Sequence, residues 1–234
     1  MGDTIQIDAR DGSGRFSAYL ARPDTQDTAP CIVVIQEIFG VNAGIRKKCD
    51  DLAAKGYAAV APDLFWRQEP NIELTDKSKA EWDRAFELMN GFDADKGVED
   101  IEATIRVARD HDGSNGKVGC VGYCLGGKLA YMTATRTDID ASVGYYGVGI
   151  DEMTDEAKSI ANPLMLHIAE EDGFVDKEAQ AKMHQALDPH PKVELHDYPG
   201  CDHAFAREDG ISRVEAAAQL ADERTLAFFE RHLK

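Results

Sequence analysis

The sequence predicts an α/β protein with a mostly parallel, doubly wound sheet and helices on both faces. Two observations carry this prediction. Short runs of apolar and β-branched residues alternate along the chain with longer segments of helical periodicity, and several of these runs are continuously apolar, as in strands buried on both faces. Because the 234 residues contain no repeat, low-complexity segment or linker, we expect one domain spanning residues 1–234.

The predicted strands begin with a β-hairpin. Apolar and polar residues alternate from Ile5 to Leu20 around the turn-forming sequence Asp-Gly-Ser-Gly at 11–14. Further strands are predicted from apolar runs, the last of them alternating like a strand near a sheet edge: 31–35, 57–61, the run that precedes Cys124, 141–146, 163–169 and 193–198.

Helical patterning fills most of the intervals between these strands. The predicted helices are 45–55 with Gly56 as C-cap, 77–89, 95–109, the segment from Leu125 to about Arg136, and 212–233. In the last helix, four apolar residues are expected to share one face: Ala216, Leu220, Leu226 and Phe229. Residues 62–75 are rich in turn formers and carry Phe65 and Trp66, which look exposed, so this segment predicts a loop over an active-site edge.

The segment Gly122-Tyr123-Cys124-Leu125-Gly126 has the pattern Gly-x-nucleophile-x-Gly between a predicted strand and a predicted helix. In this arrangement the nucleophile sits on a sharp turn, and the flanking glycines let strand and helix approach closely. A helix N-terminus beneath the sulfur favours a thiolate. The alternative is a buried core cysteine beside a glycine-rich bend.

A cysteine nucleophile needs a base, and the base needs an orienting acceptor. Asp172 follows the strand at 163–169, and His203 follows the strand at 193–198, so both are expected at the same edge of the sheet. The order nucleophile, acid, histidine is that of α/β-hydrolases. Glu170 and Glu171 compete with Asp172 for the orienting role, and His203 could instead be a surface-loop histidine.

Glu37 directly follows a predicted buried strand. A charged, unpaired carboxylate there would cost several kcal/mol, so we expect it to be hydrogen-bonded or protonated. It is either a solvated residue at a strand end or a proton acceptor for the thiol of Cys124. The backbone N–H groups of Ile38 and Leu125 are candidate donors to an oxyanion.

The composition of the chain limits the classes of binding partner that we expect. The formal net charge of −17 argues against nucleic acid and anionic membranes, and an anionic substrate would need a local cation. We find no signal peptide and no bilayer-spanning run, and five cysteines without framework spacing indicate free thiols in the cytoplasm. Neither Cys120 with Cys124 nor His196 with Cys201 and His203 has metal-ligand spacing, so no metal or other cofactor is expected.

Four segments together resemble the dienelactone hydrolase family (carboxymethylenebutenolidases) of the α/β-hydrolase superfamily. They are Gln-Glu-Ile-Phe-Gly-Val-Asn at 36–42, Gly-Cys-Val-Gly-Tyr-Cys-Leu-Gly-Gly at 119–127, Val-Gly-Tyr-Tyr-Gly-Val-Gly at 143–149 and Gly-Cys-Asp-His-Ala-Phe-Ala-Arg at 200–207. The resemblance covers nearly the whole chain and implies an α/β-hydrolase fold.

The resemblance also implies a carboxylic ester hydrolase acting on a small anionic lactone, and we expect the protein to be a monomer. The implied reaction converts 4-carboxymethylenebut-2-en-4-olide to maleylacetate in the catabolism of chlorinated aromatics, through an acyl-thioester on Cys124. His203 and Asp172 complete the implied triad, and Glu37 takes the thiol proton when substrate binds, so that Cys124 rests as a neutral thiol. Arg207 matches the arginine that receives the substrate carboxylate.

The helix at 77–89 departs from the family pattern. Where the family has a second carboxylate-binding arginine, this sequence has Trp82, and where the family has a nearby tyrosine, it has Phe86. Arg84 lies two residues from each of these positions. With Phe39, these residues are the candidate substrate contacts. Cys201 also departs from the family pattern. It is either an inert small residue or a redox partner for Cys124. Other lactones, short-chain esters or thioesters are therefore alternative substrates, and a non-catalytic lactone-binding protein or thiol sensor is a rival of another class.

Overall fold

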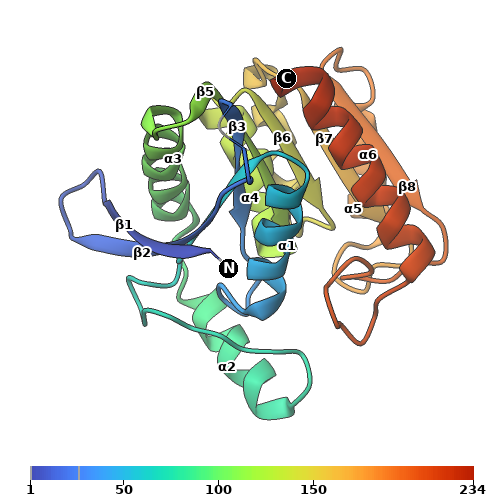
Figure 1. Ribbon diagram of the computed structural model, residues 1–234. Helices are drawn as coiled ribbons and strands as arrows, with labels where there is room; N and C mark the ends of the chain where they lie inside the picture. The colour runs from blue at the N-terminus through green and yellow to red at the C-terminus, as the bar shows by residue number, and fades with distance from the viewer. Residues whose placement is uncertain (1, 26) are drawn as a thin grey trace. The chain divides into compact units, whose positions relative to one another are not determined.

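The computed structural model describes residues 2–25 and 27–234, and its ribbon is shown in Figure 1. Residue contacts divide the chain into two compact units, one ending at Val118 and one beginning at Gly119. Each unit is compact by itself. A single domain over residues 1–234 therefore stays a prediction.

The first unit carries four strands in the order β1-β2-β4-β3. Its elements are β1 (Asp3–Asp8), β2 (Arg15–Ala21), β3 (Ala29–Ile35), α1 (Ala43–Ala54), β4 (Ala58–Pro62), α2 (Lys79–Asn90) and α3 (Ala94–Asp110). β1 and β2 form the predicted antiparallel hairpin, whereas β3 and β4 run parallel, with Val33 opposite Val60. Every residue of β3 and β4 is buried, as their continuous apolar composition predicts.

The segment 62–75 is irregular, as expected, but its aromatic residues are not exposed. Phe65 is fully buried and lies edge-on to Phe92, and Trp66 is half-buried and stacks on Phe16 of β2. The expectation of exposure was wrong because tertiary contacts of aromatic rings leave no trace in the local pattern of a loop.

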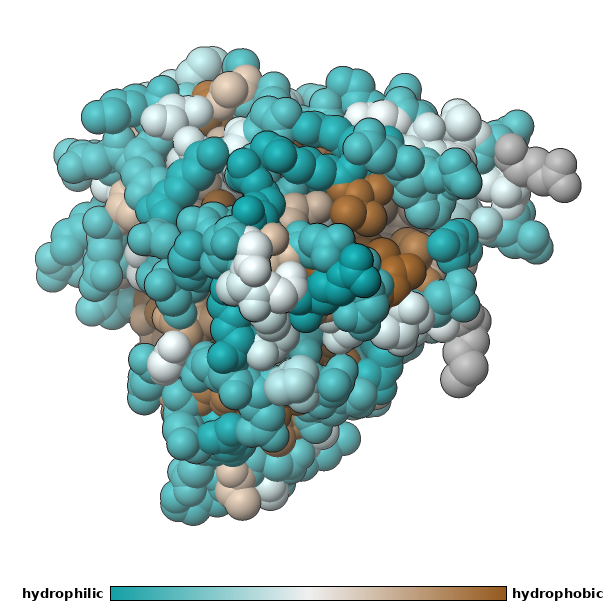
Figure 2. Space-filling model, turned by 90° about the vertical axis from the view of Figure 1, so that its left-hand side faces the viewer, coloured by the Kyte–Doolittle hydropathy of each residue, from teal (hydrophilic) through white to brown (hydrophobic). Residues whose placement is uncertain are grey.

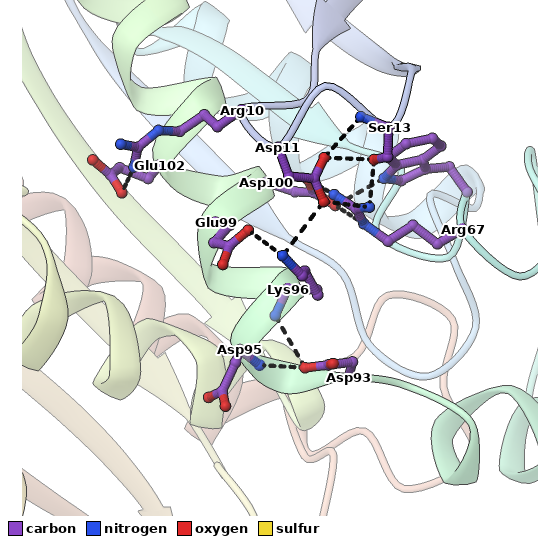
Figure 3. Close-up of polar contacts among 11 residues, drawn as sticks. Arg10, Asp11, Ser13, Arg67, Asp93, Asp95, Lys96, Glu99, Asp100 and Glu102 are labelled. Carbon is purple, nitrogen blue, oxygen red and sulfur yellow. Dashed lines mark hydrogen bonds and ion pairs between the residues drawn. The ribbon is translucent and has the colours of Figure 1, made fainter.

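An ion-pair network fastens this loop to its neighbours, and we call it the Arg67 network (Figure 3). Arg67 donates from Nε and Nη2 to the carboxylate of Asp100 in α3, and from Nη1 to Asp11 and Ser13 in the β1–β2 turn. Trp66 donates its indole N–H to the same Asp100 carboxylate. Asp100 is almost fully buried, so these charge-assisted bonds compensate its lost hydration.

The second unit carries four strands that run parallel in the order β5-β6-β7-β8. Its elements are β5 (Ser114–Tyr123), which begins before the boundary at Val118, α4 (Leu125–Arg136), β6 (Ala141–Tyr145), the 3₁₀ segment η1 (Asp151–Ser159), β7 (Leu164–Ala169), α5 (Lys177–Leu187), β8 (Val193–Tyr198) and α6 (Glu215–Leu233). Neither η1 nor α5 was predicted.

Helices cover both faces of β7. Leu164, Leu166 and Ile168 project to one face and join a hydrophobic cluster with residues of α4 and α5. His167 projects to the other face, where its Nε2 lies 3.0 Å from the hydroxyl of Thr225 in α6. Within this unit the arrangement is therefore doubly wound, and α6 runs alongside the strands in Figure 1.

The buried face of α6 differs from the one expected. Of the four expected residues, Ala216 and Leu220 are exposed and Leu226 is only partly buried, whereas Phe229 is buried. The face that packs inward is lined by Ala218, Ala221, Thr225, Phe228, Phe229 and Leu233. This face combines small side chains with two phenylalanine rings, and its burial leaves Ala216 and Leu220 on the exposed side of the helix.

Candidate active site

Cys124 occupies the sharp turn between β5 and α4. Its backbone has φ 56° and ψ −114°, a left-handed conformation that costs a non-glycine residue free energy and is common at functional sites. The turn is held by the Cys124 N–H, which donates to the carbonyl of Tyr145 at 3.0 Å, and by the Cys124 carbonyl, which accepts from the N–H of Gly127 at 2.9 Å.

Gly122 permits this turn. A Cβ atom built at residue 122 would lie 1.9 Å from the carbonyl oxygen of Gly126, far inside van der Waals contact. The close approach of strand and helix thus requires glycine here, as the motif indicates. Leu125 begins α4, and the first N–H groups of a helix have no partner within the helix.

His203 and Asp172 meet over the second unit, and both side chains are buried. Nδ1 of His203 lies 2.9 Å from Oδ2 of Asp172, and His203 also makes a side-chain hydrogen bond with Cys124. Glu171 is instead exposed and Glu170 partly exposed, and both interact with Lys177. The structure thus brings Cys124, His203 and Asp172 together and leaves the two competing glutamates outside.

The surroundings of His203 change its acidity. Burial acts to lower its pKa, but the negative charge at Cys124 and the hydrogen bonds with Asp172 and Cys124 outweigh it and raise the pKa to about 10. The imidazole is therefore protonated at neutral pH.

Two residues that sequence reasoning missed hold the loops of this site. Oδ1 of Asp202 accepts from the N–H of His203 at 2.6 Å and of Gly173 at 3.1 Å, which ties the His203 loop to the Asp172 loop. The position of Asp202, directly before a candidate histidine, was the available signal.

Gln180 is the second missed residue and anchors the Asp172 loop from α5. Its side-chain amide donates to the carbonyls of Ala169, Glu170 and Val175 at 3.3, 3.1 and 2.8 Å. Gln180 is almost fully buried, so these bonds also satisfy a polar group that water does not reach. No local signal marked it, because α5 itself was not predicted.

Two aromatic rings contact the imidazole of His203 edge-on. The ring of Tyr146 lies 5.1 Å away between centroids, and Tyr146 has a positive φ of 39° directly after β6. The ring of Phe174 lies 4.8 Å away, and its backbone N–H donates to Oδ1 of Asp172 at 2.8 Å. Both residues restrict the orientation of the imidazole.

Arg207 and Cys201 lie on the loop that carries His203, and both are buried. The backbone N–H of Arg207 donates to the carbonyl of Ala204 at 3.0 Å. Burial raises the pKa of the Cys201 thiol, which disfavours the reactive thiolate and supports the inert role over the redox role.

The remaining candidates belong to the first unit. Glu37, Ile38 and Phe39 follow β3 and are buried. Phe39 lies edge-on to Trp82 at 5.0 Å between centroids, and Trp82 stacks on Phe86 at 5.5 Å. These three aromatic residues form one cluster, which we call the Trp82 cluster.

Arg84 does not join the Trp82 cluster. Its guanidinium pairs with Glu87 in α2 and with Glu69 in the preceding loop. It is therefore already neutralised by two carboxylates and is a poor replacement for a carboxylate-binding arginine.

Two further observations concern the residues that the structure describes. Among 2–25 and 27–234, no group of three or more histidine, cysteine, aspartate or glutamate side chains is arranged to hold a metal ion. Over the same residues, none of the helices combines the length and the apolar composition that crossing a bilayer requires.

Comparison with known proteins gives consistent matches. A family model described as the dienelactone hydrolase family matches residues 16–233. Carboxymethylenebutenolidase 1 of Cupriavidus pinatubonensis is 41% identical over 226 residues, which cover 97% of this chain and 95% of that protein. A protein of Azospirillum brasilense, provisionally given the name carboxymethylenebutenolidase, is 51% identical over 230 residues, 98% of each chain.

A solved structure also matches over nearly the whole length of this chain. The crystal structure of a Klebsiella pneumoniae protein, provisionally described as a dienelactone hydrolase, has a TM-score of 0.86 and 27% sequence identity, and the match covers 99% of this chain and 100% of that one. The predicted α/β-hydrolase fold class is confirmed by this match.

Proposed function

The chain belongs to the dienelactone hydrolase family, and from this membership we propose that it hydrolyses 4-carboxymethylenebut-2-en-4-olide to maleylacetate. The observation that carries the proposal is the position of His203, hydrogen-bonded to Asp172 on one side and to Cys124 on the other. This is the arrangement in which a base activates a nucleophile while a third group orients the base.

In the proposed reaction, the Cys124 thiolate attacks the lactone carbonyl carbon. The backbone N–H groups of Ile38 and Leu125 are proposed to stabilise the oxyanion of the tetrahedral intermediate. The ring C–O bond then breaks, leaving an acyl-thioester on Cys124 and an enolate oxygen, which takes a proton from the imidazolium of His203. Neutral His203 then removes a proton from the water that attacks the thioester, and the thiolate of Cys124 leaves. In the alternative path, the enolate is not protonated by His203 and itself takes the proton of that water.

Two charged residues are proposed to serve an anionic substrate. Arg207 is proposed to bind the substrate carboxylate, since a guanidinium offers a fork of N–H donors and this acidic chain needs a local cation. Glu37 is proposed to take the thiol proton of Cys124 when the anionic substrate binds at Arg207. We further propose that the enzyme works as a cytoplasmic monomer without a cofactor.

The Trp82 cluster supports a second candidate function, the hydrolysis of other lactones or of short-chain esters and thioesters. An aromatic surface at Trp82 and Phe86 replaces charged and hydroxyl groups expected in the family, and Arg84 is held by two glutamates. Loss of a charged hydrogen-bond partner weakens anion binding by about 1.5–3 kcal/mol. Apolar substrates would lose nothing here.

The test follows lactone turnover and the acyl-enzyme together. Rapid-quench mass spectrometry should detect a covalent adduct on the wild-type protein and none on Cys124→Ala, with turnover lost in the variant. Persistent turnover by Cys124→Ala would exclude the proposed nucleophile, and stoichiometric binding without product would favour the non-catalytic rival.

Two comparisons refine this result. Glu37→Gln should slow formation of the adduct, and an unchanged rate would remove Glu37 from the mechanism. A p-nitrophenyl ester that is hydrolysed as efficiently as the lactone would favour the second candidate function.

A further inference from the structure

Phe174 is the unexplained residue beside the candidate active site. It is 53% exposed, although it is one of the largest apolar side chains of the protein. It stands two residues after Asp172, and the bond from its N–H to Oδ1 of Asp172 fixes its backbone. An apolar ring left in water at a fixed position forgoes hydrophobic stabilisation that a bound ligand could restore.

The ring of Phe174 is directed by its contact with His203. The two ring centroids are 4.8 Å apart and the planes are inclined at 71°. The other aromatic neighbour of the imidazole, Tyr146, is 2% exposed and already packs on Phe205. Of the two aromatic rings that contact His203, only that of Phe174 has a large solvent-accessible surface that a ligand could cover.

The chemistry of His203 indicates which part of a ligand would lie on that surface. An imidazolium that protonates a leaving oxygen must come within hydrogen-bond reach of it, about 2.6–3.2 Å. The leaving group that carries this oxygen must therefore lie next to the imidazole. The ring of Phe174, which contacts the imidazole, is then within reach of that leaving group. The acyl part of the substrate is bonded to Cys124 and lies on the other side of the broken bond.

We propose that Phe174 is a specificity-determining residue that favours esters with a flat, conjugated leaving group, such as an enol or a phenol. The proposal deepens the proposed function and rests on it, because it takes His203 as the acid for the leaving group. A flat π-system can stack on or meet the edge of the Phe174 ring and bury it, whereas a short alkyl group covers little of it.

A purely structural role makes a different prediction. If Phe174 only held the imidazole in place, its removal would slow the cleavage of every ester by the same factor. The ratio of two substrates that share an acyl group separates these roles, since the acylation machinery is common to both.

The experiment measures kcat/KM for phenyl acetate and ethyl acetate with wild type, Phe174→Ala and Phe174→Leu. We expect Phe174→Ala to lower the value for phenyl acetate about tenfold, mainly through KM, and to change the value for ethyl acetate less than about twofold. Phe174→Leu keeps apolar bulk without a flat ring and should lower the phenyl-to-ethyl ratio about threefold. Leu220→Ala removes another exposed apolar side chain, which is 42% exposed and lies in α6, and should leave both values unchanged.

Equal losses for both esters, or no loss for either, would overturn the proposal. The lactone assay is run in parallel to separate the two hypotheses. A wild-type protein that cleaves phenyl acetate but not the lactone would remove the proposed substrate and leave the Phe174 result standing. A wild-type protein that cleaves neither ester would contradict the assignment of Phe174.

Discussion

At the scale of single residues, Cys124 illustrates how a site stores backbone strain. Its positive φ places the sulfur at the head of α4, and neighbouring hydrogen bonds to Tyr145 and Gly127 hold the turn. The end of β5 and most of α4 are buried on either side of the turn, and their packing helps to sustain the strain.

Gly122→Ala tests the close approach that this turn needs. The added Cβ would collide with the carbonyl of Gly126, which belongs to backbone and cannot move aside, so we expect loss of more than about 3 kcal/mol of stability. Gly113→Ala is the matched control, because nothing lies near its Cβ and only its positive φ is strained, at about 1–2 kcal/mol. Urea unfolding measures both, and equal losses would contradict the steric explanation.

The proton on His203 can be followed directly by NMR titration of its Cε1–H. The pKa is raised from the ordinary 6.5 to about 10, so the stabilisation it gives the fold is fully present below pH 6.5 and is lost as the pH rises through about 10. Cys124→Ala removes a negative partner and should move the midpoint to lower pH, as should Asp172→Asn. A midpoint that stays in place in both variants would exclude the ion pair.

At the scale of elements, two loops are held by side chains from helices that precede or follow them. Gln180 of α5 binds three carbonyls of the Asp172 loop, and the Arg67 network ties the segment 62–75 to α3 and to the β1–β2 turn (Figure 3). In both cases a buried polar group meets several partners, which makes the loop geometry unique rather than merely stable.

Arg67→Met tests the Arg67 network. It leaves the buried carboxylate of Asp100 without its two guanidinium bonds, so we expect a loss of about 2–3 kcal/mol in the free energy of unfolding. Lys79→Met, which breaks the exposed pair with Asp83, is the control and should cost less than about 0.5 kcal/mol. Similar costs for the two variants in urea unfolding would show that Asp100 is adequately solvated.

At the scale of the whole molecule, the formal net charge of −17 is the dominant property. The face shown in Figure 2 is covered mainly by hydrophilic residues, with small separate hydrophobic areas. The excess negative charges on the protein repel one another, and this repulsion destabilises the compact folded state.

Salt should therefore stabilise the protein at neutral pH. Raising NaCl from about 0.02 to 0.3 M shortens the screening length severalfold, and we expect the Tm at pH 7 to rise by about 3 °C or more. Near pH 5, close to the pI of about 4.7, the same change in salt should have little effect. Differential scanning calorimetry at the two pH values measures the rise in Tm with salt. An equal rise in Tm at both pH values would assign the effect to general salting-out.

The sequence by itself determined the features that depend on local patterns. Continuous apolar runs located the central strands to within a few residues, because burial on both faces demands apolar side chains, and alternation located the hairpin and the strand at 193–198. The glycine spacing around Cys124 identified the sharp turn. The chain order also selected His203 and Asp172, since parallel strands end at one edge of a sheet.

Only the tertiary structure decided which side chains meet across these elements. The inward face of α6, the burial of Phe65, the anchoring by Gln180 and Asp202 and the contact of Phe174 with His203 each join residues that are distant in sequence or whose local pattern is ambiguous. Such contacts follow from the close packing of whole elements, which no short window of sequence encodes.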